Sequence, residues 1–263
     1  MFGNSAKVRV KSYRHCDVAN LAQKLKRYVR PGDRVMVISD AVFSMDGDIA
    51  PLPEMLDVLA NYPGSILVMD EAHASGSIEP TGGGIYEHFG IKPQQAIEHG
   101  IVPLIMTTFS KFAASVGAAI SSNCREFIDL LDASPTSITT ASVPPPATAA
   151  ALEAIRQTRQ NPQLVQALQA NAGYLRSRLL ERDFNPLGET HVIPIILPGE
   201  LNPKAFARQL IEEHGIWVSP IWFVAKPRLR IVANALHSRE EMDLLVEAMA
   251  AVRNALYPTN RVS

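Results

Sequence analysis

The stretch SILVMDEAHASG, residues 65–76, decides how this chain is interpreted. Its apolar start predicts a buried strand, and the strand ends on Asp70, Glu71 and His73. The letters DEAH after an apolar strand also occur among the metal-binding carboxylates of helicases. That chemistry needs a phosphate-binding loop, GxxxxGKS or GxxxxGKT, and this sequence contains none. The glycine cluster at residues 81–84 has no lysine and follows DEAH, so the sequence argues against a nucleoside triphosphatase.

Composition excludes several broad classes of function. The 263 residues are 47% hydrophobic and 19% charged, which is ordinary for a globular protein with a sizeable core. A net charge of −1 creates no global field that recruits nucleic acid or an anionic membrane. No run of 18 apolar residues predicts a membrane span, and the first residues lack the apolar region of a secretory signal. Cys16 and Cys124 form no CxxC pair and suit a reducing, cytoplasmic location.

Strands alternate with helices in the first half of the chain. Near-continuous apolar strands separated by helices predict a parallel sheet that is covered on both faces. Asp17 is the expected N-cap of the first helix, and a proline opens the second. The strands are expected at residues 8–13, 34–40, 65–72, 103–110 and 117–122, and the helices at 17–29 and 52–62.

The pattern changes after residue 134. A polar segment with three prolines leads into an alanine-rich helix that is expected to continue to about residue 182. Helices and strands then follow as an α+β unit. We therefore predict a large domain at residues 1–155 and a small C-terminal domain at residues 156–263.

The segment FSMDGD, residues 43–48, superficially suggests a calcium loop. It lacks the distal glutamate and the remaining ligands of an EF-hand, so a turn after a strand is the favoured interpretation. The sequence predicts no metal site.

Polar side chains follow three of the predicted strands, and ligands of open α/β sheets bind at the carboxyl ends of strands. These ends carry Asp40 with Ser44, Asp70 with His73, and residues 107–111, TTFSK. Each group alone is explained by capping or solvation. Together they offer the amine, carboxylate and hydroxyls that pyridoxal phosphate needs, with the carboxylate on the pyridine nitrogen.

Several segments resemble the α-oxoamine synthase family in the family's own order. They are YRHCDVANL, FSMDGDIAPL, MDEAHASG, TTFSKFAASVGAAI and RLRIVANALH. The family includes 8-amino-7-oxononanoate synthase, 2-amino-3-ketobutyrate CoA ligase and serine palmitoyltransferase. The resemblance implies the fold-type I, aspartate aminotransferase-like architecture of pyridoxal-phosphate enzymes. That architecture has a mostly parallel sheet in a large domain and a smaller α+β domain.

The resemblance also implies the cofactor contacts. Lys111 would be the Schiff-base lysine, Asp70 the partner of the pyridine nitrogen, and His73 the neighbour of the phenolic oxygen. Ser44 would contact the cofactor, and Thr108 would hold its phosphate.

The implied reaction joins a small α-amino acid to an acyl-CoA or acyl thioester, with loss of carbon dioxide and release of the thiol. Arg230 would bind the substrate carboxylate, with Arg228 as its rival on the same strand face. Lys111 would also move the α-proton, and with Asp70 and His73 it forms the expected catalytic set.

The chain departs from the family in two places. Members carry a longer region before the segment that resembles residues 13–21, and that region supplies early strands, one of them beside the strand expected at residues 8–13. Phe112 follows the lysine where the family has small residues, and we predict that it packs.

Because family members carry the longer region, we expect a homodimer, or a heterodimer with a chain supplying that region. The alternative is a non-catalytic scaffold or regulatory subunit, or an inactive fragment.

Overall fold

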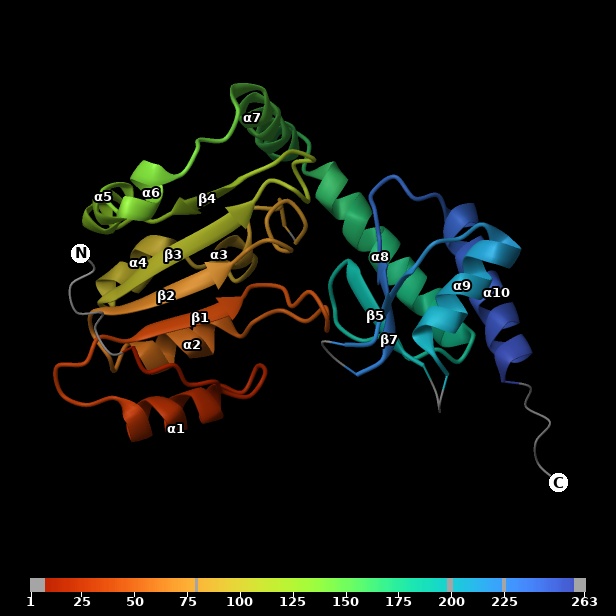
Figure 1. Ribbon diagram of the computed structural model, residues 1–263, viewed down its shortest axis with the longest axis horizontal. Helices are drawn as coiled ribbons and strands as arrows, with labels where there is room; N and C mark the ends of the chain where they lie inside the picture. The colour runs from red at the N-terminus through yellow and green to blue at the C-terminus, as the bar shows by residue number, and fades with distance from the viewer. Residues whose placement is uncertain (1–7, 79, 198–200, 224–225, 258–263) are drawn as a thin grey trace.

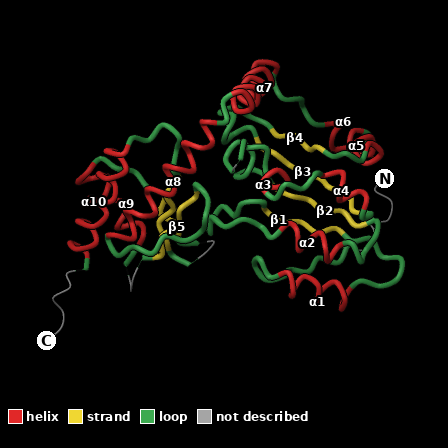
Figure 2. Tube along the Cα trace, turned by 180° about the vertical axis from the view of Figure 1, so that it is seen from behind, coloured by secondary structure: helices red, strands yellow, loops and turns green. Residues whose placement is uncertain are grey.

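The computed structural model describes residues 8–78, 80–197, 201–223 and 226–257. The described chain forms two sheets, each with its own cluster of buried apolar side chains. Figures 1 and 2 show these sheets as separate groups of strands, with α7 and α8 between them in the chain. No described helix is long and apolar enough to cross a membrane.

The N-terminal sheet has four strands in the order β1-β2-β3-β4. The first three strands are parallel, and β4 runs antiparallel to β3. These strands confirm the predictions made from the apolar runs after residue 34. Their bounds are Met36–Asp40 for β1, Ser65–Asp70 for β2, Ile101–Thr108 for β3 and Ala118–Ser121 for β4.

Helices α1 (Val18–Tyr28) and α2 (Leu52–Leu59) bury their apolar residues in the core of this sheet. Asp17 caps α1 as predicted, because its carboxylate accepts a hydrogen bond of 2.7 Å from the backbone N–H of Asn20. The short helices α3 (Ile85–His88) and α4 (Pro93–Glu98) precede β3.

The expectation that both faces of the sheet are covered is wrong at β1. Val37 and Ser39 point into the core, whereas Met36 and Ile38 are 53% and 62% exposed. Side chains alternate along a strand, so the exposed pair shares the second face of β1. No described helix shields these two side chains from solvent.

The strand expected at residues 8–13 is also absent. Val8 and Val10 are more than four-fifths exposed, and the segment has no regular secondary structure. A strand is stable only beside a hydrogen-bonding neighbour, and among the described strands β1 pairs only with β2. The alternating valines therefore have no ladder to join.

The connection between the sheets contains four helices. The single long helix expected up to residue 182 is instead two helices, because the chain breaks at Asn161 and Pro162. Asn161 has a non-helical backbone, with φ −127° and ψ 65°, and the residue before a proline is disfavoured in the α region. The helices are α5 (Arg125–Asp132), α6 (Pro135–Thr139), α7 (Pro145–Gln160) and α8 (Gln163–Glu181).

The C-terminal sheet is antiparallel and has the order β5-β7-β6. Its helices α9 and α10 pack on it, and Ser238 and Glu241 cap α10 reciprocally. The domain boundary expected between residues 155 and 156 falls inside α7 and stays a prediction. The bounds are Val192–Ile196 for β5, Pro203–His214 for α9, Ser219–Ile221 for β6, Arg228–Val232 for β7 and Arg239–Leu256 for α10.

The loop after β1 joins the two sheets. Residues 44–46 form the turn expected there, closed by a hydrogen bond of 2.7 Å from the Gly47 N–H to the Phe43 carbonyl. Gly47 has a φ of 73°, and a Cβ at this position would collide with the Val192 carbonyl. The Thr190 hydroxyl donates to the Gly47 carbonyl over 2.8 Å, so the C-terminal sheet holds the turn in place.

Arg228 makes the strongest contact with this turn. It is buried, and one nitrogen donates to the Met45 carbonyl at 2.6 Å and to the Asp46 carboxylate at 2.7 Å. A second nitrogen donates to the Lys226 carbonyl at 2.9 Å. Arg228 therefore fixes the loop after β1 against β7.

We predict that Arg228→Ala lowers the free energy of unfolding by about 1.5–3 kcal/mol, because buried acceptors lose a charged donor. Solvent screens part of the ion pair, since the Asp46 side chain is 40% exposed. The matched control is Arg208→Ala, which removes an exposed pair with Glu212 and should cost under about 0.5 kcal/mol. Urea unfolding of the three proteins measures the difference, and equal losses in both variants contradict this role.

Candidate active site

Three parallel strands end at one edge of the N-terminal sheet. Figure 1 shows the arrowheads of β1, β2 and β3 directed toward the C-terminal part of the molecule. Asp40 is paired in register with Asp70, and Asp70 with Met106. The residues that follow these three positions therefore start from the same level of the sheet, as the sequence predicted.

Two carboxylates lie at this edge. Asp70 accepts a hydrogen bond of 2.9 Å from the Ala72 N–H, which orients its side chain in the turn after β2. Burial and the negative charge of Asp70 raise the pKa of Asp40, while the positive charges of Lys111 and His15 oppose that shift. Asp40 is therefore within electrostatic reach of both Asp70 and Lys111.

His73 lies on the turn after β2 and is partly buried. Burial and the charges of Lys111, His191 and Arg230 lower the pKa of His73 to about 4. The imidazole is therefore neutral at pH 7 and can donate one hydrogen bond without adding a positive charge.

His191 is a candidate site residue that the sequence reasoning missed. Its ring centroid is 6.4 Å from that of His73, and its Nδ1 is buried without a hydrogen-bond partner. Burial and the charges of Arg176 and Arg230 lower the pKa of His191 to about 4. A histidine that opens an otherwise apolar strand, HVIPIIL, was the available signal.

Lys111 lies in the loop between β3 and β4 and is exposed. Backbone hydrogen bonds from Phe109 to Gly117 and from Ser115 to Phe109, at 2.9 and 2.8 Å, close this loop at its base. The hydroxyls of Thr108 and Ser110 are 2.9 Å apart at the start of the loop. This pair of hydroxyls beside an amine can bind a phosphate group.

The structure separates the two arginine candidates. Arg228 is committed to the turn after β1, whereas Arg230 makes one hydrogen bond, of 3.1 Å, to the Ser44 carbonyl. The Nε of Arg230 is buried without a partner, and burial lowers the pKa of its guanidinium. Arg230 therefore keeps donors for a ligand. Ser44 contributes its carbonyl oxygen to this arrangement.

Glu71 points to the opposite face of the sheet, as its position beside Asp70 predicted. It is buried and accepts hydrogen bonds from the Ile85 N–H at 2.9 Å and the Ser75 hydroxyl at 3.0 Å. Burial raises the pKa of Glu71.

A second carboxylate, that of Glu87, accepts hydrogen bonds from the backbone N–H groups of Thr81 and Gly83. The Glu71 and Glu87 carboxylates thus bind backbone N–H groups of the kind that a phosphate-binding loop would use. This arrangement supports the conclusion that the site does not bind a nucleotide.

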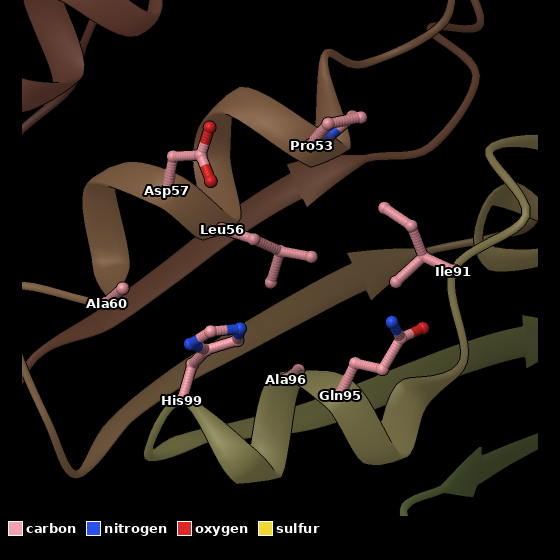
Figure 3. A pocket seen from close by; sticks show the side chains of 8 residues that line it. All are labelled: Pro53, Leu56, Asp57, Ala60, Ile91, Gln95, Ala96 and His99. Atoms are coloured by element: carbon pink, nitrogen blue, oxygen red, sulfur yellow. The ribbon is translucent and has the colours of Figure 1, made fainter.

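Two cavities lie outside this cluster of candidate residues. A cavity of about 180 Å³ lies between α2 and α4, and Figure 3 shows His99 and Asp57 among the side chains that line it. A cavity of about 360 Å³ lies beside the Lys111 loop, and Phe112 lines it. Phe112 packs against Gly76, so the predicted packing role is confirmed. None of the predicted cofactor-binding side chains lines either cavity.

Comparison with known proteins identifies the class to which this arrangement belongs. Residues 3–249 match the family model of class I and II aminotransferases, and the chain belongs to this family. The fold predicted from the resemblance, a mostly parallel fold-type I sheet with a smaller α+β unit, is confirmed.

The similar proteins include 8-amino-7-oxononanoate synthases, which are members of the α-oxoamine synthase family that the sequence motifs indicated. The chain is 33% identical over 258 residues to 8-amino-7-oxononanoate synthase of Symbiobacterium thermophilum, covering 95% of this chain and 63% of the relative. The synthase of Petrotoga mobilis is 34% identical over 252 residues, 93% of this chain and 61% of its own length.

Solved structures of serine palmitoyltransferases also resemble this chain. Serine palmitoyltransferase of Sphingomonas wittichii superimposes with a TM-score of 0.82 at 28% identity, covering 92% of this chain and 60% of the neighbour. A structure of a serine palmitoyltransferase with pyridoxal phosphate gives a TM-score of 0.80 at 28% identity. The chain therefore spans about three fifths of the length of the relatives that it matches.

We predict that His191 makes folding sensitive to acid. The unfolded chain binds a proton there as the pH falls through 6.5, whereas the folded chain resists protonation until about pH 4. The contribution of His191 to stability is therefore fully present above this window and is lost as the pH falls through it. This loss should account for up to about 2 kcal/mol of the decrease in unfolding free energy between pH 7 and pH 5, and His191→Gln should make that decrease smaller by the same amount.

Urea unfolding at the two pH values measures this effect. His99→Gln is the matched control, because His99 is exposed and remote from His73. If both variants keep the pH dependence of the original chain, His191 is not a source of acid sensitivity.

Proposed function

We propose that this chain is a pyridoxal-phosphate-dependent acyltransferase of the α-oxoamine synthase type. The observation that carries the proposal is one group of side chains at the carboxyl edge of β1, β2 and β3. Lys111 acts electrostatically on both Asp40 and His73, and Asp40 pairs in register with Asp70. An amine, two carboxylates and a neutral imidazole therefore share one edge of the sheet.

The side chains at this edge fit pyridoxal phosphate. Asp70 offers a carboxylate for the pyridine nitrogen, and Lys111 an exposed amine for the aldehyde carbon. The Thr108 and Ser110 hydroxyls offer donors for the phosphate. The buried Nε of Arg230 has no partner, which supports a polar ligand beside it.

Each side chain has a defined task in the proposal. When bound, pyridoxal phosphate supplies an electron sink for negative charge that develops on the substrate α-carbon. The Asp70 carboxylate holds the proton on the pyridine nitrogen, because a charge-assisted hydrogen bond favours the charged ring. Lys111 Nζ accepts the α-proton and returns a proton later. Neutral His73 donates to the phenolic oxygen, and Arg230 binds the substrate carboxylate.

The proposed substrates are a small α-amino acid and an acyl-CoA or related thioester. A carbon–carbon bond forms between the amino-acid α-carbon and the acyl carbon. The acyl C–S bond breaks, and the thiol leaves with its electron pair and a proton. The bond from the α-carbon to the carboxylate breaks, and carbon dioxide leaves. The relatives named above support this reaction class, and we propose a cytoplasmic location for it.

We also propose that the site is completed by association, in a homodimer or in a heterodimer. Relatives are longer than the region that this chain matches. The exposed face of β1 carries Met36 and Ile38, and Ile120 on β4 is 51% exposed. Apolar side chains on outer strands support contact with further protein, on the same polypeptide or another.

The alternative is a subunit that keeps the fold and binds partners without turnover. The exposed β1 face favours this alternative as much as it favours an enzyme that needs a second subunit. Thiol release from acyl-CoA in the presence of glycine, serine or alanine separates the two. Cofactor loading without thiol release, in the chain and in its assemblies, supports the scaffold.

We predict that borohydride reduction links pyridoxal phosphate to Lys111. Purified chain mixed with the cofactor should gain a near-ultraviolet to visible absorption band, and peptide mass spectrometry should find the label on Lys111. Lys111→Ala should lose the band and the label, because Lys111 is the amine that acts electrostatically on both Asp40 and His73.

The control variant is Lys26→Ala, which alters an exposed lysine on α1 and should load normally. Labelling that spreads over several surface lysines, or that persists unchanged in Lys111→Ala, contradicts cofactor binding at this site.

A further inference from the structure

His15, Cys16 and Asp48 converge beside the candidate active site. His15 Nε2 is 2.6 Å from an Asp48 carboxylate oxygen, and Cys16 Sγ is 3.6 Å from the same oxygen. Cys16 Sγ is 3.7 Å from His15 Nε2. The three atoms come from the segment before α1 and the loop after β1, so the fold brings them together and their spacing along the chain does not.

The chemistry of these three atoms is that of a zinc site. Thiolate, imidazole and carboxylate are the ligands that Zn²⁺ takes in proteins. Tetrahedral coordination at ordinary Zn–ligand lengths separates sulfur from nitrogen or oxygen by about 3.5 Å, and nitrogen from oxygen by about 3.3 Å. Both sulfur separations already match within a few tenths of an ångström. Only the His15–Asp48 pair, now hydrogen-bonded, has to open, by about 0.7 Å.

The charges around Cys16 favour a cation. The Asp48 carboxylate lies against the Cys16 thiol, and Asp46 and Glu189 add negative charge nearby. A divalent ion bound here would displace the thiol proton to solvent and would be neutralised by one thiolate and one carboxylate.

The ligand atoms are held by their surroundings. The His15 ring stacks edge-on against Phe43 with centroids 4.3 Å apart. The Asp48 carbonyl accepts a hydrogen bond of 3.0 Å from the Phe43 N–H, which fixes the backbone of the loop. The second carboxylate oxygen of Asp48 is buried without a hydrogen-bond partner. His15 is partly exposed, which leaves the fourth coordination position open to water.

We propose that His15, Cys16 and Asp48 form a site for Zn²⁺ with a water molecule as the fourth ligand. The ion would fasten the segment before α1 to the loop after β1, which carries Ser44. This site does not depend on pyridoxal phosphate. The sequence does not predict this metal, because Cys16 and Asp48 are 32 residues apart and meet only in the folded chain.

Two measurements on the whole chain test the site. The first is titration with Co²⁺, which reports thiolate coordination through a charge-transfer absorption band and is displaced by Zn²⁺. One equivalent should give the band in the original chain and in Cys124→Ser. Cys16→Ser should lose the band, and Asp48→Asn should weaken metal affinity about tenfold or more. Circular dichroism checks that each variant is folded.

The second measurement needs no variant. Zn²⁺ should slow alkylation of Cys16 by iodoacetamide about tenfold or more, because a coordinated thiolate is shielded. Cys124 serves as the internal control, because it lies at the start of α5, away from these ligands, and should react at an unchanged rate. Equal alkylation rates with and without Zn²⁺, or a cobalt band that persists in Cys16→Ser, overturns the proposal.

Discussion

Parallel pairing of β1, β2 and β3 places Asp40, Asp70 and Met106 at one level of the sheet. Every candidate side chain is positioned relative to that level. A shift of one residue in any strand would turn its side chains to the opposite face, since side chains alternate. Asp70 would then exchange places with Glu71, whose buried carboxylate holds the Ile85 and Ser75 donors. The hydrogen-bond ladder of the sheet thus determines which carboxylate faces the site.

Local patterns were sufficient to predict much of this arrangement. The apolar runs predicted β1 to β4, and Asp17 was predicted as the cap of α1. Alternation along β2 predicted that Asp70 and Glu71 face opposite ways. These features depend on neighbours in sequence, where side-chain periodicity and backbone preferences act directly. The family resemblance added the proposed roles of Lys111 and Arg230, which periodicity alone does not assign.

Features that depend on distant neighbours were not predictable from local patterns. Residues 8–13 have the composition of a strand, but a strand needs a partner, and none lies beside them in the described chain. His191 became part of the site only through β5 and the turn after β2. Arg228 and Arg230 share a strand face, and they are distinguished by the contacts of Arg228 with Met45 and Asp46 in the turn after β1. Cys16 likewise meets Asp48 only in the folded chain.

The most direct test of the central claim is a crystal structure of the chain grown with pyridoxal phosphate. We expect density for the cofactor at the carboxyl edge of β1, β2 and β3. Its aldehyde carbon should be bonded to Lys111 Nζ, and its ring nitrogen should lie within hydrogen-bond distance of the Asp70 carboxylate. A cofactor bound elsewhere, or one whose ring nitrogen faces away from Asp70, contradicts the assignment of this edge as the active site.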